Sequence, residues 1–317
     1  MRTDSEHEHS TRVAHHRHQN SARTAAVLVA VLFSIGPAAH FAHPANVRSA
    51  ELSGPATDVP FDGSNVAHEI AIEMVTPGNE GLKLSAKLVE DGGVIDRPIS
   101  WKIATSEGEQ IFSGDVPVAD IRVPPGDYAV DIHYGAAHFA RGLTLLEGNR
   151  LSVSFVLNVG GIRILPRVQG IGLPASPSHS RVYALSGLRK GELITQSEIP
   201  GEILRVPAGD YRVESRFDAG NAVAVADVKV KPGIMSAVEI DHAAGLARLA
   251  FVGAPSADVA WNVADDKGEA LASFEGLSAD IVLKPGTYTA SASAGGEVLT
   301  AKFDIGAGES RDIILGN

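Results

Sequence analysis

The sequence predicts an all-β protein built from three antiparallel β-sandwich modules in tandem, after an N-terminal signal segment. One turn phrase occurs three times. The segments around it alternate apolar and polar residues, and turn-forming clusters separate them at intervals of about 8–12 residues, as in antiparallel sandwiches. With 33 Gly, 17 Pro and only 5% aromatic residues, the composition also favours short strands and many turns over long helices.

The repeated phrase ends in a glycine followed two residues later by a tyrosine. It reads Val-Pro-Pro-Gly-Asp-Tyr at 123–128, Val-Pro-Ala-Gly-Asp-Tyr at 206–211 and Lys-Pro-Gly-Thr-Tyr at 284–288. The match extends upstream, because Trp101 and Trp261 each precede their phrase glycine by 25 residues and Tyr183 precedes Gly209 by 26. Agreement at an aromatic residue and at a turn indicates a threefold internal repeat.

The repeat divides the chain into segments. We expect a signal peptide or N-terminal anchor at 1–45, a Pro/Gly/Ser-rich linker at 46–65, and modules at 66–158, 159–243 and 244–317.

Each module reads as a series of short strands. In the first copy, residues 82–88, 99–103 and 151–157 alternate apolar and polar side chains, which is typical of half-buried strands. Turn clusters such as residues 90–93 separate them. Nothing after residue 45 shows a helical period.

The phrase itself predicts a tight turn into a strand. Proline presets its backbone for a turn, and the glycine is expected to supply the positive φ of a type II turn. The tyrosine then packs its ring while its hydroxyl binds backbone, as in the tyrosine corner of immunoglobulin- or transthyretin-like sandwiches. The residues that we expect to carry this structural repeat are Gly126, Tyr128, Gly209, Tyr211, Gly286, Tyr288, Trp101 and Trp261. The tryptophans are expected in the core, with a sugar-stacking platform as the alternative.

The N-terminus resembles a secretory signal. Residues 25–35 form an apolar run after Arg23, and Gly36-Pro37 and small residues follow it. The run is shorter than the roughly 20 residues of a membrane-spanning helix, so we expect cleavage within 38–45. An uncleaved anchor is the alternative, and both place the modules in the periplasm or outside the cell. The histidines before the run, at positions 7, 9, 15, 16 and 18, are expected to be solvated rather than to bind metal.

Charge and cysteine content exclude several partners. A net charge of −11 disfavours nucleic acid and anionic lipid surfaces, so contact with a membrane is expected only through an uncleaved N-terminal segment. The absence of cysteine removes disulfides, thiolate nucleophiles and Cys-ligated zinc.

The phrase, the glycine-marked hairpin and the alternating strand after it resemble PEGA and carboxypeptidase-regulatory-like repeats of bacterial envelope proteins. The first copy also looks like the β-rich tails of alphaproteobacterial proteins that carry a von Willebrand A domain. That domain is absent here, since no Asp-x-Ser-x-Ser motif occurs. The resemblance implies an accessory or scaffold role at the envelope, with no catalytic residues to transfer.

Catalytic and metal-binding motifs are missing from the modules. There is no Gly-x-Ser-x-Gly, His-Glu-x-x-His or P-loop, and no acidic run with calcium-loop spacing. His133 and His138 have no histidine counterparts in the other copies and are expected to be surface variation. The modules also contain His68, His179 and His242. We therefore expect no catalytic site, no cofactor and no metal.

These observations favour an exported, non-catalytic envelope protein that acts as a structural spacer or a protein-interaction array. Its partner would be another envelope protein or an envelope polymer, and a protein partner could add a strand at an exposed sheet edge. A carbohydrate- or polymer-binding protein that uses exposed aromatic residues is the alternative.

Overall fold

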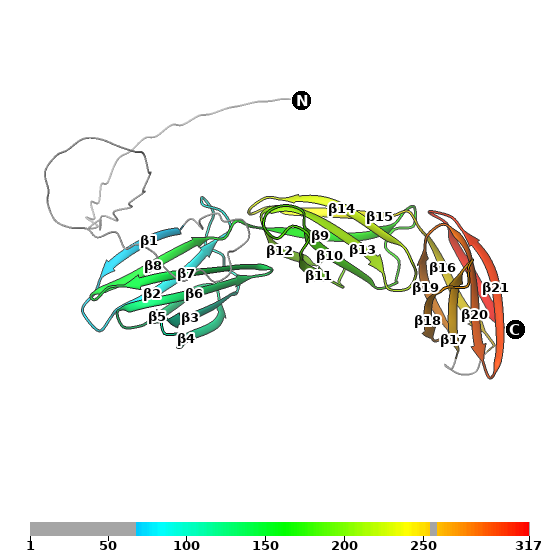
Figure 1. Cartoon of the computed structure of the whole chain (residues 1–317), viewed down its shortest axis with the longest axis horizontal. Helices are drawn as coiled ribbons and strands as arrows, with labels where there is room; N and C mark the ends of the chain where they lie inside the picture. The colour runs from blue at the N-terminus through cyan, green and yellow to red at the C-terminus, as the bar shows by residue number, and fades with distance from the viewer. Residues whose placement is uncertain (1–67, 254–258, 317) are drawn as a thin grey trace, which may run out of the picture. The chain divides into compact units, whose positions relative to one another are not determined.

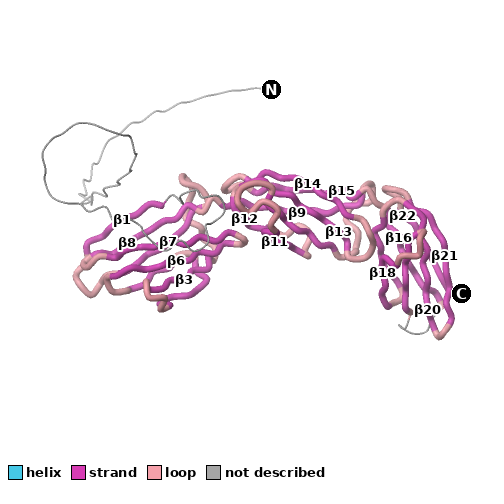
Figure 2. Tube along the Cα trace, viewed as in Figure 1, coloured by secondary structure: helices cyan, strands magenta, loops and turns pink. Residues whose placement is uncertain are grey.

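The computed structural model describes residues 68–253 and 259–316, all within one contact unit that spans Arg48–Asn317. Strands joined by turns and loops make up these residues, with no helix among them (Figures 1 and 2). The all-β prediction is confirmed. The expected signal segment and linker lie outside the described residues.

Module 1 packs two four-stranded sheets. One has the order β1-β8-β2-β5 and the other β4-β3-β6-β7. Their bounds are β1 His68–Met74, β2 Gly81–Lys87, β3 Ile99–Thr105, β4 Gln110–Val116, β5 Ala119–Arg122, β6 Gly126–Tyr134, β7 Ala137–Leu145 and β8 Asn149–Val156.

Module 2 packs a three-stranded sheet, β12-β9-β15, on a four-stranded sheet, β11-β10-β13-β14. Their bounds are β9 Val159–Val168, β10 Ser178–Ala184, β11 Leu193–Ser197, β12 Ile203–Pro207, β13 Gly209–Phe217, β14 Val223–Val230 and β15 Met235–His242.

Module 3 repeats this plan with sheets β19-β16-β22 and β18-β17-β20-β21. Their bounds are β16 Gly245–Val252, β17 Ala260–Asp265, β18 Ala270–Glu275, β19 Ser278–Leu283, β20 Gly286–Ala294, β21 Glu297–Ile305 and β22 Ser310–Gly316. In every module the last strand runs parallel to the first strand of the shared plan, as in β8 on β2, β15 on β9 and β22 on β16.

The predicted alternation places the core. In β6 the residues Tyr128, Val130, Ile132 and Tyr134 are buried while those between them face outward. Trp101 and Trp261 are 0% and 2% exposed, and their indole N–H groups donate to the carbonyls of Val116 (2.9 Å) and Gly276 (3.0 Å).

A tyrosine corner occurs in each module. The hydroxyl donates to the carbonyl four residues earlier: Tyr128 to Pro124 at 2.5 Å, Tyr211 to Pro207 at 2.6 Å and Tyr288 to Lys284 at 2.8 Å. Each bond joins the start of a strand in one sheet to the end of a strand in the opposite sheet. Burial raises the pKa of the Tyr128 hydroxyl and of the Tyr211 hydroxyl.

The expected role of the phrase glycine is wrong. Gly126, Gly209 and Gly286 are the first residues of β6, β13 and β20, and none has a positive φ. A Cβ atom at Gly286 would lie 3.4 Å from the Tyr288 hydroxyl, an ordinary contact. The glycine therefore begins a strand beside the tyrosine ring rather than supplying a left-handed turn residue.

The middle copy has no aromatic counterpart of the tryptophans. Trp101 and Trp261 pair with the residue four positions after their corner tyrosine, and in module 2 that register belongs to Ser180, opposite Ser215. Tyr183, which the sequence spacing suggested, is only half-buried. The interior of module 2 is accordingly more polar at this end.

Removing the hydroxyl at the middle corner tests its contribution. Tyr211→Phe should lower the free energy of unfolding by about 1–3 kcal/mol, because the buried Pro207 carbonyl loses its donor. Chemical denaturation measures this. Tyr183→Phe, at a half-buried position in the same module, is the control and should change stability by less than about 0.5 kcal/mol.

Candidate functional site: the module junctions

The junction between modules 1 and 2 is made by a hairpin loop that meets an edge strand. The two-residue loop between β6 and β7 lies against Arg205 of β12, where the Ala136 N–H donates to the Arg205 carbonyl at 2.8 Å. Gly135 has a φ of 65°, and a Cβ there would lie 2.5 Å from the Arg205 Cβ. The Arg205 guanidinium also lies 5.1 Å from the centre of the Tyr134 ring, within cation–π range.

The junction between modules 2 and 3 uses the same elements. Gly220, in the loop between β13 and β14, forms a parallel bridge with Val282 of β19, and the Val282 N–H donates to the Ala219 carbonyl at 3.2 Å. A Cβ at Gly220 would lie 1.9 Å from the Val282 carbonyl oxygen, so only glycine fits. Asn221 accepts from the Lys284 N–H (2.8 Å) and donates to the corner hydroxyl of Tyr288 (3.2 Å).

The two junctions place a glycine-containing loop against the same repeat position of an edge strand, although the loop donates the backbone hydrogen bond in the first junction and accepts it in the second. β12 and β19, both labelled in Figure 1, are end strands of their sheets. Arg205 and Val282 occupy the same repeat position, four residues before the phrase glycine. The methyl groups of Ala136 and Ala219 pack against the core of the next module.

Apolar packing closes the second junction further. A buried cluster joins residues of module 2 to residues of module 3: Val168, Phe217, Ala222, Ala244, Leu246 and Val282. A core shared by two modules opposes hinge motion between them, because bending would expose apolar surface.

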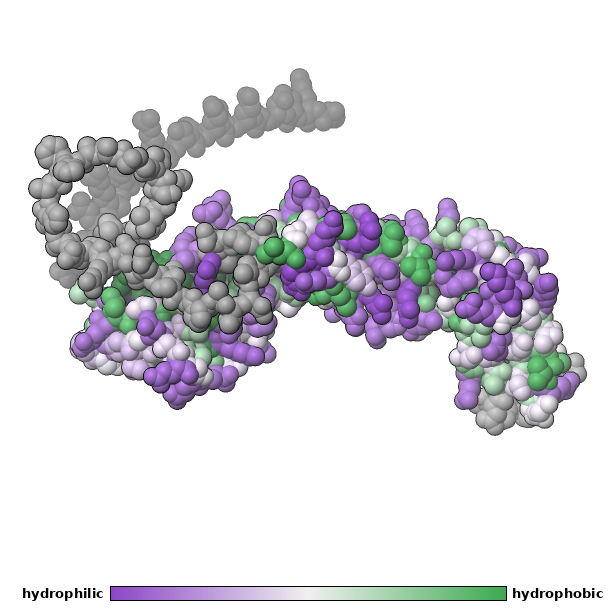
Figure 3. Space-filling view, viewed as in Figure 1, coloured by the Kyte–Doolittle hydropathy of each residue, from purple (hydrophilic) through white to green (hydrophobic). Residues whose placement is uncertain are grey.

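The sequence-predicted repeat residues are structural in this arrangement. The tryptophans are buried and cannot stack on a sugar. In the described ranges every Phe, Tyr and Trp is buried or half-buried, so an exposed aromatic platform is missing there. On the face drawn in Figure 3, apolar side chains occur in separate small groups rather than in one patch.

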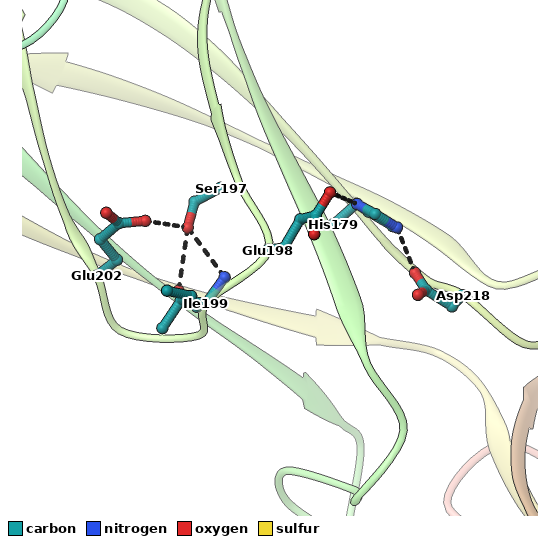
Figure 4. A network of polar contacts seen from close by, with 6 residues as sticks. All are labelled: His179, Ser197, Glu198, Ile199, Glu202 and Asp218. Carbon is teal, nitrogen blue, oxygen red and sulfur yellow. Dashed lines mark hydrogen bonds and ion pairs between the residues drawn. The ribbon is translucent and has the colours of Figure 1, made fainter.

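His179 lies between two carboxylates at one end of module 2. Its Nδ1 is 3.4 Å from Glu198 Oε1 and its Nε2 is 2.6 Å from Asp218 Oδ1 (Figure 4). Ser197 instead binds Glu202 and the backbone of Ile199. Because both ring nitrogens face carboxylate oxygens, neither is placed to take a proton from a serine hydroxyl, and the cluster ties two loops together.

Asp218 also lines an open groove of about 820 Å³ beside the second junction. Module 3 contributes Phe274, Glu275 and Asp280, and Ser176 and Pro177 come from module 2. The groove is acidic and has no cationic side chain in its lining.

The other histidines differ in exposure. His133 and His138 stack across the β6–β7 hairpin with ring centroids 4.2 Å apart, and Asp131 lies 3.2 Å from His138. Burial, the neighbouring His138 and Lys102 lower the pKa of His133.

Residues 68–253 and 259–316 hold no group of three or more His, Cys, Asp or Glu side chains arranged for a metal ion. No helix long and apolar enough to cross a bilayer occurs in the same ranges.

His242 is buried beside the second junction, a position that the sequence did not predict. It is 1% exposed, its Nε2 lies 3.1 Å from the Ser215 hydroxyl, and its ring centre is 4.8 Å from that of Phe217. Burial lowers its pKa, opposed by the backbone of Ala222 and by the charge of Asp241.

Comparison with protein families finds one match. Residues 251–315 are similar to the Rhizobiales growth-associated tandem repeat domain, which covers most of module 3 and supports its reading as a repeat unit. The match is neither to PEGA repeats nor to a von Willebrand A-associated tail, so those resemblances are not confirmed. No curated protein matches.

Several solved structures are similar to parts of the chain. The Streptococcal ancillary pilin is 10% identical over 72% of this chain and 95% of its own, with a TM-score of 0.27. BcpA, the major pilin subunit of Bacillus cereus, is 8% identical over 75% and 99%, with a TM-score of 0.21. The Bacillus anthracis TIE protein is 14% identical over 75% of this chain, with a TM-score of 0.22, and the match spans half of its length. Similarity at this level carries no argument about function.

Burial of His242 predicts a pH dependence of stability. Its folded pKa is lowered, so the unfolded chain binds the proton more tightly, with a pKa near 6.5. The contribution of neutral His242 to the free energy of unfolding is therefore fully present above about pH 6.5. It is lost as pH falls below that value, by at most about 1.4 kcal/mol per pH unit. Denaturant midpoints between pH 7.5 and about pH 5 measure the slope.

His242→Leu should flatten this slope even if it changes stability at pH 7.5. Ile240→Val, a buried change in the same strand that alters no ionisable group, is the control and should leave the slope unchanged. An unchanged slope in His242→Leu would show that another group controls the acid sensitivity.

Proposed function

We propose that this chain is an exported, non-catalytic structural protein whose three sandwiches form a stiff array that spaces or holds other envelope components. The observation that carries the proposal is the repeated junction. A glycine hairpin of one module meets an edge strand of the next with no room for a side chain.

The surroundings of the histidines support the same role. His133 and His138 stack on each other, His242 is buried and His179 lies between carboxylates, so none of the four is paired with a hydroxyl in an open cleft. A structural role needs only a stable fold, fixed junctions and sheet edges that accept partners.

Export is proposed from the N-terminal sequence. The apolar run of residues 25–35, with a basic residue before it and small residues after it, is the pattern of a secretory signal. The absence of cysteine suits the cytosol and a periplasm equally, so the proposal of export depends on the N-terminal run alone. An envelope-polymer ligand is not favoured, because the tryptophans proposed for it are buried.

Stiffness at the second junction can be measured with spin labels, because the chain has no cysteine of its own. Labels at Lys190→Cys in module 2 and Lys302→Cys in module 3 should give one narrow distance distribution by pulsed electron spin resonance. Gly220→Ala should broaden it, because the new methyl group meets the Val282 carbonyl.

Gly268→Ala is the matched control. Gly268 also has a positive φ, of 84°, but a Cβ there meets nothing within 4 Å. This variant also places an alanine at a positive φ, but without the junction clash, and should keep the narrow distribution. A broad distribution in the parent chain would contradict the stiff array.

A further inference from the structure

Each of the two junction surfaces has a further copy among the described residues. The loops of modules 1 and 2 contact β12 and β19, whereas in the corresponding loop between β20 and β21 of module 3 a Cβ at Gly295 or Gly296 would meet nothing within 4 Å. Likewise, β5 of module 1 is an end strand at the repeat position of β12 and β19. Within residues 68–253 and 259–316, this loop and the outer side of β5 pair with no other strand.

The loop of module 3 has the form of the loop that docks in the first junction. Both are two-residue loops between nine-residue strands, and Gly135 and Gly295 each follow their corner tyrosine by seven residues. Their φ angles are 65° and 57°. A Cβ at Gly135 would collide with Arg205, whereas at Gly295 it would meet nothing within 4 Å.

The edge strand of module 1 has the form of the strand that receives the loop. Arg122 lies four residues before Gly126, as Arg205 lies four before Gly209, and Arg122 is exposed. A hollow of about 540 Å³ adjoins it, lined by Pro77, Glu80, Pro124 and Glu147 among others. The site is therefore open to a small hairpin.

We propose that the Gly295–Gly296 hairpin of one copy docks on β5 of a second copy, and so continues the internal junction between chains. In this contact the Gly296 N–H donates to the Arg122 carbonyl of the second copy, as the Ala136 N–H does to Arg205 within one chain. The two surfaces differ, so the association is head-to-tail and builds chains or rings rather than two-fold dimers. The inference rests on the proposed structural function and extends it to self-assembly.

The contact between chains is weaker than the junction within one chain, for two reasons. Ala294 stands at the place of Tyr134, so the Arg122 guanidinium finds no ring to cover. The internal junctions also form at the high effective concentration of one chain, whereas docking between copies depends on protein concentration.

Sedimentation equilibrium of the full chain, from micromolar to millimolar concentration, tests the proposal. The weight-average mass should rise with concentration. Gly295→Asn should lower the association constant at least tenfold, because asparagine tolerates a left-handed backbone in the free loop but its Cβ collides with β5 on docking. Gly268→Asn, in an open turn of the same module, should associate as the parent chain does.

A second variant gains the missing contact. Ala294→Tyr places a ring where Tyr134 covers Arg205, and it should strengthen association about two- to fivefold through a cation–π contact with Arg122. A chain that stays monomeric at every concentration, or that associates equally with and without Gly295→Asn, would overturn the proposal. Either result would leave the spin-label distances unaffected, so failure of self-assembly is distinguishable from failure of the stiff array.

Discussion

The structure depends on one hydrogen bond that occurs three times, from a tyrosine hydroxyl to the carbonyl four residues earlier. The bond joins the end of one sheet to the start of a strand in the other, and it therefore fixes how the two sheets of each sandwich meet. In module 3 the same hydroxyl also accepts from Asn221 of module 2. A local corner thereby takes part in holding neighbouring modules together.

The corner also determines where the junction strand ends. Arg205 and Val282 lie just before the corner in β12 and β19, at the open edge of their sheets, where the preceding hairpin meets them. An open edge is ordinarily a risk for uncontrolled pairing. At each junction a glycine-containing loop of the preceding module contacts this edge at one position, Arg205 or Val282, and a packed core behind the second junction resists separation.

Module 2 departs from its neighbours where it meets module 3. Ser180 occupies the register that holds tryptophan in the other modules, with Ser215 opposite it, and His242 completes a buried polar group beside Phe217. Because small polar residues replace a buried aromatic side chain here, hydrogen bonds and the apolar cluster at the junction contribute a larger share of the stability of this module.

The sequence by itself determined the fold class, the threefold repeat, the buried tryptophans and the tyrosine corners, because period-2 alternation and turn chemistry are local properties. Only the tertiary structure decided the backbone of the phrase glycines, the serine at the tryptophan register, and the partners of Gly135 and Gly220. These depend on pairing between strands far apart in the chain, where one residue of register moves a side chain to the opposite face. A glycine in a loop does not reveal from sequence which neighbour approaches it, and for that reason the junctions became visible only in the folded chain.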